Sequence, residues 1–183
     1  MACVTLSGSR KLPCNSGQAG ILAVSIGEYD SFNRIQKTPT GVVSIADQFP
    51  AASLARFAVK ADSINYVENG VSGGDNRSKG VTGNISIILA VTENDGVRTV
   101  QDVEQLLNGE TVVFLEKKDG TVVVIGSQNG VVTVTADDQT GGQIGDLNGF
   151  TVTFQTMEPD FSRGYVLTAP ALIEYAAAIK PVV

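Results

Sequence analysis

The side chains that most often catalyse reactions or bind metals are scarce in this chain of 183 residues. Histidine is absent, which removes the commonest general base, the imidazole metal ligands and the serine–histidine–aspartate triad. Cys3 and Cys14 have neither a third cysteine nor a histidine to complete a zinc site or to activate a thiolate. We therefore predict two ordinary thiols, no structural metal and no catalytic cysteine. The sequence leaves open whether the two cysteines pair.

Two glycine-rich segments and one acidic cluster could bind a ligand, but each lacks a part that its chemistry needs. Gly70–Asp75 is not a phosphate-binding loop, because Lys79 is outside the required Gly-Lys-Ser/Thr position and no helix pattern follows. Thr140–Gly145 precedes a turn and a strand pattern instead of a helix. The acidic cluster lacks the EF-hand spacing for calcium; it comprises Asp137, Asp138, Asp146 and Asn148. We expect turn and loop residues at all three places, and no metal or cofactor.

Two enzyme classes do not need histidine, and neither leaves a signature here. A serine–lysine dyad stays open by composition, but no Ser-x-x-Lys segment is present. Paired glycosidase carboxylates also stay open, but the chain has no tryptophan and only 6% aromatic residues to form a sugar-binding platform. We predict that the protein is not an enzyme.

The composition indicates a folded, acidic protein, with 43% hydrophobic residues, 17% charged residues and a formal net charge of −6. Basic residues occur as scattered doublets such as Lys117-Lys118, which argues against tight nucleic-acid binding. No apolar run approaches the roughly 20 residues that span a bilayer. The first residues lack the basic-then-apolar order of a signal peptide. We expect a single domain over residues 1–183, made and kept in a cytoplasm.

The elements that would position any site are mostly strands. Glu110–Glu158 contains β-branched runs separated by Asp119-Gly120 and Asn129-Gly130, which are two-residue signals for tight hairpins. These signals predict a meander of three consecutive strands: Thr111–Glu116, Thr121–Gly126 and Val131–Ala136. A fourth strand, Gly149–Glu158, alternates with a period of two, so that one face is buried; that face carries Phe150, Val152 and Phe154.

The preceding part of the chain predicts further strands and one long hairpin. Strand patterns occur at Gln18–Glu28, with Leu22, Val24 and Ile26 on one face, and at Val42–Ala46, Ala52–Val67 and Val81–Thr92. The third of these changes its apolar parity, which suggests a bulge or bend near residues 61–63. Residues 68–80 contain four glycines and almost no apolar side chains, so we expect a flexible loop that joins the long hairpin.

One helix is predicted over about residues 99–108. Thr99 and Asp102 fit the capping-box pattern, and Asn108-Gly109 ends the helix. Its apolar stripe comprises Val100, Val103, Leu106 and Leu107. Residues 1–17 should form an irregular N-terminal arm, and residues 159–183 a C-terminal extension. Within this extension, Ala171–Ile179 could be a short helix or an arm lying on a neighbour.

The order of these elements resembles the tail tube, or major tail, proteins of bacteriophages. The resemblance covers about two-thirds of the chain and rests on turn chemistry. It comprises the helix Thr99–Leu107, the Asp119-Gly120 hairpin, the Asn129-Gly130-Val131 turn, Thr140-Gly141-Gly142, and the strand from Asp146-Leu147-Asn148-Gly149-Phe150 to Met157-Glu158-Pro159. The opening residues, Met1-Ala2-Cys3 and Leu12-Pro13-Cys14, are also similar to the entry sequence of some phage proteins of this kind.

This resemblance implies a mainly β fold, a β-sandwich or partly rolled antiparallel sheet with one flanking α-helix. It implies hexameric rings that stack into a hollow tube through which DNA passes without specific binding. The partners would be further copies of this chain and other tail or head–tail proteins, with no membrane involved. The protein would be made in the cytoplasm of a host bacterium and end in the tail of the virion.

The resemblance also implies that a long hairpin loop contacts the neighbouring ring. The candidate residues for this contact are Glu68, Asn69, Gly73, Gly74, Asp75, Asn76, Arg77 and Lys79. From the net charge of −6 we further hypothesise that the solvent-facing sides of the long strands line an acidic lumen, which DNA would not adhere to. Other interpretations stay open: a head–tail ring protein, a capsid-decorating protein, or a ligand-binding β-sandwich module.

Overall fold

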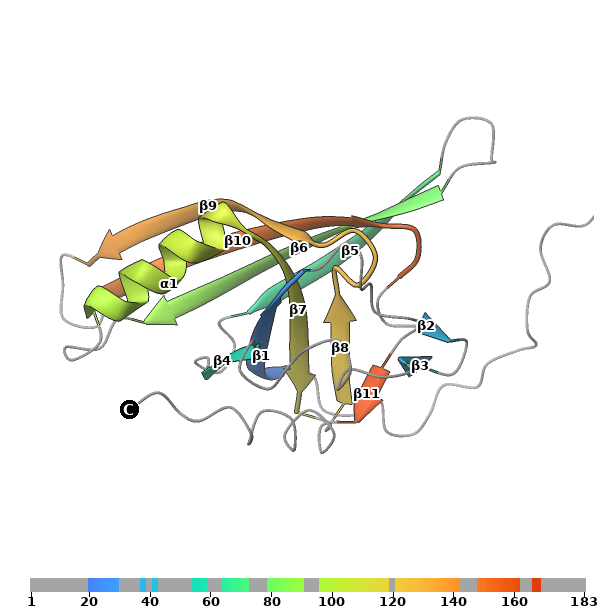
Figure 1. Cartoon of the computed structure of the whole chain (residues 1–183), viewed down its shortest axis with the longest axis horizontal. Helices are drawn as coiled ribbons and strands as arrows, with labels where there is room; N and C mark the ends of the chain where they lie inside the picture. Colours follow the sequence, from blue (N-terminus) through green and yellow to red (C-terminus); the bar gives the residue numbers. More distant parts are fainter. Residues whose placement is uncertain are drawn as a thin grey trace, which may run out of the picture.

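The computed structural model describes residues 20–29, 37–38, 41–42, 54–58, 64–72, 79–90, 96–118, 121–141, 148–161 and 166–168. The expectations for residues 1–17, for both cysteines, for Ala171–Ile179, for Asp119-Gly120 and for Asp146 lie outside these stretches. Within them the chain is mainly β, a curled antiparallel sheet with one flanking helix, as the sequence predicts (Figure 1).

The strands and the helix follow one another along the whole described part of the chain. The elements are β1 (Ile21–Glu28), β2 (Lys37–Thr38), β3 (Gly41–Val42), β4 (Leu54–Ala58), β5 (Asn65–Ser72), β6 (Lys79–Ala90), α1 (Gly96–Asn108), β7 (Glu110–Lys117), β8 (Thr121–Ile125), β9 (Val131–Thr140), β10 (Asn148–Glu158) and β11 (Val166–Thr168). Nine of the strands form one sheet, and β2 and β3 form a separate small hairpin.

The large sheet consists of two halves. In what we call the β7 half, β7 lies between β1 and β8, with β4 beyond β1 and β11 beyond β8. In what we call the β10 half, the strand order is β9-β10-β6-β5. The halves join where Glu110 and Thr111 of β7 pair with Val132 and Val131 of β9. The long strands of the β10 half cross over the shorter strands of the β7 half (Figure 1).

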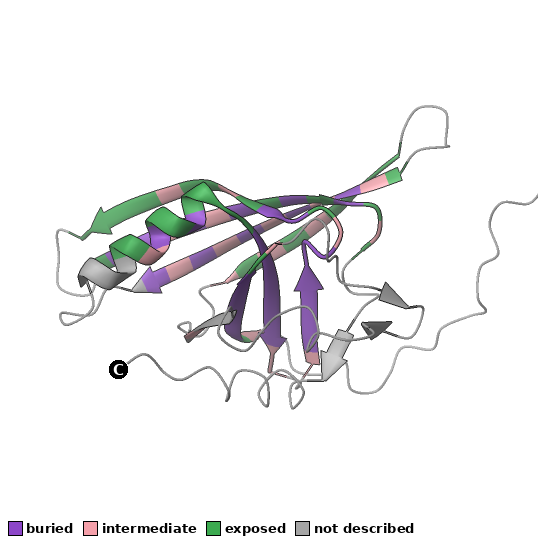
Figure 2. Cartoon of the chain, viewed as in Figure 1, coloured by how far each residue is buried: buried purple, intermediate pink, exposed green. Residues whose placement is uncertain are grey.

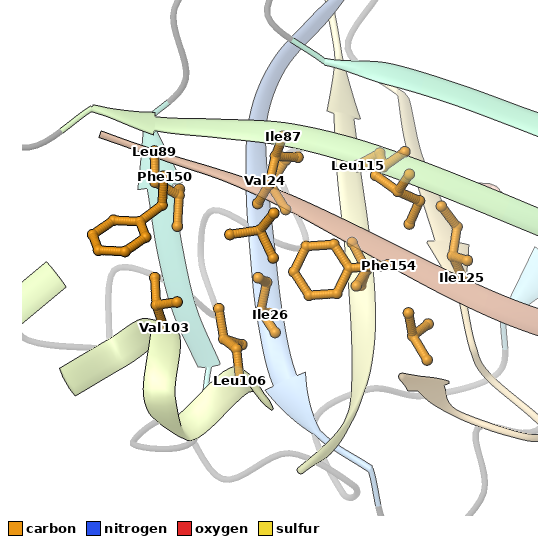
Figure 3. Packing of buried hydrophobic residues seen from close by; sticks show 14 of the residues in the cluster. Val24, Ile26, Ile87, Leu89, Val103, Leu106, Leu115, Ile125, Phe150 and Phe154 are labelled. Atoms are coloured by element: carbon orange, nitrogen blue, oxygen red, sulfur yellow. The ribbon is translucent and has the colours of Figure 1, made fainter. Parts of the chain in front are cut away.

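A hydrophobic core fills the space between the two halves. It combines side chains from β1, β6, β7, β8, β9, β10 and α1 (Figure 3). The buried members are Val24, Ile26, Ile85, Ile87, Leu89, Val103, Leu106, Val113, Leu115, Val123, Ile125, Val131, Phe150, Val152 and Phe154. The predicted alternation of the last strand is confirmed, because Phe150, Val152 and Phe154 all point into this core. The sheet curls because a single core must be covered from both halves.

The β7 half is buried on both faces, which explains its continuous apolar runs. Val113 and Leu115 lie in the core, yet Val112 and Phe114, which alternate with them, are also almost fully buried. The whole run from residue 122 to residue 125 in β8 is buried as well. Strands covered on both faces need apolar side chains at every position instead of at every second one.

Helix α1 begins earlier than the sequence predicts and covers one end of the core. It starts at Gly96, so Thr99 lies inside the helix and the predicted N-cap is wrong. The predicted end at Asn108 is confirmed. Of the apolar stripe, Val103 and Leu106 are buried in the core. Val100 and Leu107 are exposed, because only one side of this short helix faces the sheet.

The predicted three-strand meander is wrong in its third strand. β7 and β8 form a hairpin, but β9 pairs with β10 and with the start of β7 instead of with β8. The reason is the turn between β8 and β9, which spans Gly126–Gly130 and is closed by a 3.0 Å hydrogen bond from the Gly130 N–H to the Gly126 carbonyl. Both glycines have positive φ, 76° and 73°, and this wider turn directs the chain into the other half of the sheet.

Residues from distant strands hold this turn in place. The Glu158 carboxylate at the end of β10 accepts hydrogen bonds from the backbone N–H groups of Gln128 (3.0 Å) and Asn129 (3.3 Å). The Asn129 side-chain amide donates to the Met157 carbonyl at 2.7 Å, and the Tyr29 hydroxyl donates to the Gln128 carbonyl. Asn129-Gly130 therefore belongs to a corner between the halves and not to a two-residue hairpin.

Three other expected strands also differ from the prediction. Ala52–Val67 is not one strand: β4 pairs with β1, β5 pairs with β6, and the expected bend lies outside the described residues. The strand expected at Val42–Ala46 is present only as Gly41–Val42. In β1, Leu22 is exposed because a register shift between Ile21 and Ala23 turns it away from the core.

Candidate assembly surface

The candidate contact residues lie on the β5–β6 hairpin, and the predicted loop is shorter than expected. β5 continues to Ser72 and β6 begins at Lys79, so residues 68–72 and 79–80 are paired strand. Glu68 pairs with Gly83, Asn69 with Thr82, and Lys79 with Ser72. The remaining candidates lie outside the described residues; they are Gly73, Gly74, Asp75, Asn76 and Arg77. The hairpin extends away from the rest of the molecule (Figure 1).

The β10 half has one face in the core and one face in solvent. Strand register places Val67, Asn84, Gln155 and Val132 in one row across all four strands of the outward face. The Gln155 side-chain amide donates to the Asn84 side-chain carbonyl at 3.2 Å within this row. Figure 2 shows the contrast with the β7 half, whose central strands are buried almost throughout.

The outward face carries almost no charge. Its described residues are mainly Thr, Asn, Gln, Ser and Val, and Asp137 of β9 is the one charged residue that the register places there. Glu68 and Lys79 are in register with Gly83 and Ser72 on the opposite, core-side face. The net charge of −6 is therefore not concentrated on the solvent-facing sides of the long strands, contrary to the expectation from composition.

Both edges of the β10 half end in open strands. Among the described strands, β5 pairs only with β6, and β9 pairs only with β10 beyond Val132. Successive strands of this half are antiparallel, so β5 and β9 run in opposite directions. Long open edges present unpaired backbone groups that another chain can pair with.

Exposed apolar side chains gather on the strands of this same half. Val67 (45% exposed) and Val71 (57%) lie on edge strand β5, Val134 (52%) lies on edge strand β9, and Met157 (68%) lies on β10. Single exposed apolar residues are ordinary, but here three of the four lie on the two open edge strands of one sheet. An open edge with apolar side chains favours strand pairing with another molecule.

The segment that follows β10 contacts the base of the β5–β6 hairpin. Asp160 forms an ion pair with Lys79, with 2.5 Å between Oδ1 and Nζ. The Phe161 ring lies against Gly70, where an added Cβ would be 3.0 Å from the ring Cζ. A glycine inside a strand often marks such a close approach.

A pocket of about 330 Å³ lies beside the C-terminal part of α1. Ile26, Phe57 and Leu106 provide its apolar side, and carboxylates lie among its other lining residues; they are Glu28, Asp102 and Glu110. No described group of three or more acidic or cysteine side chains is arranged to hold a metal ion. The pocket also lacks a described lysine or serine that could serve as a nucleophile.

Asp137 and Asp138, predicted to lie in a polar loop, are paired residues of β9. Alternation along the strand sends their side chains to opposite faces, so they cannot converge on one calcium ion.

The described helical segment lacks the length and apolar character that crossing a bilayer requires.

No protein-family model matches the chain, and neither a curated protein nor a solved structure matches it. A functional inference therefore depends on the chain's own residues and their arrangement.

Sequence reasoning identified the hairpin but missed the residues that shape this surface. Val67 and Val71 were attributed to a strand end and a loop, because the positions between them are Glu68, Asn69 and Gly70. Val67 and Val71 lie on one face of β5, but Asn69 between them interrupts the apolar alternation, so the sequence carried no clear signal for the longer strand. Phe161, 91 positions from Gly70, has no local signal at all.

Proposed function

We propose that this protein is a structural subunit that assembles with copies of itself into closed rings, and that the rings stack into a tube that DNA passes through, as in a bacteriophage tail. The observation that carries this proposal is the β10 half, a four-stranded sheet whose two edge strands are open among the described strands and carry exposed apolar side chains.

The directions of the edge strands favour a ring. Because β5 and β9 run in opposite directions, β5 of one copy can pair antiparallel with β9 of the next. This contact is heterologous, since it joins two different surfaces, and heterologous contacts generate rings when the rotation closes. Repetition around a ring would join the β10 halves into one continuous barrel without edges.

In such a barrel, the outward face of the β10 half would line the lumen. Its surface of Thr, Asn, Gln and Ser carries one described charge per copy, that of Asp137. A lining without clustered lysine or arginine gives no favourable counterion release with phosphates, so DNA would not be held. We therefore replace the acidic lumen of the first hypothesis by a nearly neutral, polar one.

The β5–β6 hairpin is the natural contact between stacked rings. It extends beyond the sheet, and the residues between its strands, 73–78, include Arg77 and Asp75. Replacement of residues 73–78 by a two-residue turn should leave rings that form but do not stack. The deletion should stop at these residues, because residues 68–72 and 79–80 belong to the paired strands.

The test uses one charged substitution on each edge. Val67→Lys places a charge on β5, and Val134→Lys places one on β9; charges on an edge strand oppose pairing. Leu22→Lys is the matched control, since Leu22 is equally exposed (51%) but lies on β1, within the β7 half. The mass of each protein is measured by light scattering across a range of concentrations.

Heterologous pairing predicts a specific outcome for mixtures. Each edge variant alone should stay monomeric. An equal mixture should stop at dimers, because the intact β5 of Val134→Lys can pair with the intact β9 of Val67→Lys. The two edges that remain free in this dimer both carry the added lysine. The control should assemble like the unmodified chain. Assembly lost in Val67→Lys but kept in Val134→Lys would instead indicate a two-fold β5–β5 contact. An unmodified chain that stays monomeric at high concentration would contradict the proposal.

A further inference from the structure

The β5–β6 hairpin continues past the strand that supports it. The last pair between β10 and β6 joins Glu158 to Val81, so that among the described strands Lys79 and Gly80 of β6 pair with β5 alone. Beyond the Gly70–Val81 pair the described hairpin is a ribbon of two strands, residues 71–72 and 79–80. An isolated two-stranded ribbon is only marginally stable in water and would not keep a fixed direction by itself.

The three residues after β10 supply the missing support. Chain alternation places Gly70 and Lys79 on the same, core-side face of the ribbon. The Phe161 ring contacts Gly70, and the Asp160 carboxylate contacts the Lys79 ammonium at 2.5 Å. Residues 159–161 follow directly after the end of β10, and they lie across this face at the base of the ribbon.

We propose that Asp160 and Phe161 form a brace that fixes the direction of the β5–β6 ribbon, so that the ribbon meets a second copy of this chain already oriented. The part of this inference that concerns the second copy rests on the proposed function. A segment that is ordered before association loses less conformational entropy on binding, so a preset ribbon favours assembly.

Both contacts are partly exposed, so each should stabilise the direction of the ribbon only modestly. The side chains of Lys79 and Asp160 are 75% and 45% exposed, and ion pairs with such exposure contribute little and weaken with salt. Phe161 is itself about half exposed, so its ring supplies the larger, salt-independent part. Gly70 has a clear role in this arrangement, because any side chain there would push against the ring.

Amide hydrogen exchange on the full, unassembled chain tests the brace directly. Phe161→Ala should accelerate exchange of the ribbon amides, residues 71–72 and 79–80, by roughly tenfold. Asp160→Asn should accelerate it by roughly threefold at low salt, and this difference should vanish at high salt. Exchange at Ile85–Leu89, in the core part of β6, should not change. Met157→Ala is the control, since Met157 is exposed on the opposite face.

A charge reversal makes the test specific for the ion pair. Lys79→Asp combined with Asp160→Lys should restore slow exchange, whereas each single reversal should accelerate it. Unchanged ribbon exchange in both Phe161→Ala and Asp160→Asn would overturn the brace. If exchange rises but the concentration at which half of the chain assembles stays the same, the link to the second copy is overturned. An unmodified chain that never assembles contradicts the proposed function, while the exchange rates still decide whether the brace exists.

Discussion

The two halves of the sheet differ in how they are covered, although their strands alternate along the same chain. In the β7 half, β7 and β8 are buried on both faces; β1 pairs with the outer side of β7 and β11 with the outer side of β8. In the β10 half, one face is exposed, both edge strands lack a second pairing partner among the described strands, and exposed apolar side chains lie on each edge strand. The central strands of the first half are enclosed on both faces, whereas the β10 half leaves one face in solvent.

This difference separates folding from assembly. Substitutions in the β7 half should act on the free energy of unfolding, and substitutions on the outward face or edges of the β10 half should act on association. The turn at Gly126–Gly130 is the exception, because it belongs to the junction through which the chain passes from one half to the other. The predictions below test this separation.

The largest loss of stability is expected for Phe114→Ala in β7. The Phe114 side chain is fully buried, and removing it leaves a cavity in tightly packed surroundings. The free energy of unfolding should fall by about 3–5 kcal/mol, as measured by urea denaturation of the monomer at low concentration. A loss below about 1 kcal/mol would mean that this face of β7 is not tightly packed in solution.

An intermediate loss is expected for Gly126→Ala at the junction. Gly126 has φ of 76°, and an added Cβ would lie 2.3 Å from Val131 Cγ2. Backbone strain and overpacking together should lower the free energy of unfolding by about 2–4 kcal/mol. Gly80→Ala is the matched control, because no atom lies within 4 Å of its added Cβ, and it should change stability by less than about 0.5 kcal/mol. Equal effects of the two substitutions would contradict the special role of the turn.

The smallest effect on stability is expected for Thr153→Lys on the outward face of β10. Thr153 pairs with Ser86 and Thr135 within a face that carries almost no charge. The free energy of unfolding should change by less than about 0.5 kcal/mol. If this face lines a lumen, assembled particles of the variant should bind a short DNA duplex at low salt, in contrast to the unmodified chain. Fluorescence anisotropy with a labelled duplex measures this binding. Identical binding by the variant and the unmodified chain would contradict the claim that this face lines the lumen.

The sequence predicts those features of the fold that depend on local patterns. The apolar alternation of Phe150, Val152 and Phe154 identified a half-buried strand, and Asn108-Gly109 identified the end of the helix. The β5–β6 hairpin was expected because two strand patterns flank a glycine-rich segment. Such features follow from side-chain periodicity and turn chemistry within a few residues.

Features that depend on distant partners could not be predicted. Asn129-Gly130 is a hairpin signal by itself, but Glu158 and Tyr29 hold it in a wider turn that directs β9 away from β8. Residues 52–67 form one pattern, yet their partners β1 and β6 belong to different halves. The candidate surface was expected in the loop between β5 and β6, whereas the described residues place its features on the strand edges and on Phe161.

Electron microscopy of the concentrated protein tests the central claim most directly. Negatively stained particles of the unmodified chain should be rings or tubes with a stain-filled central hole, and Val67→Lys should abolish them while Leu22→Lys preserves them. Such particles would show that the open edges of the β10 half close into a continuous wall. Monomers at every concentration, or solid particles without a hole, would contradict the account.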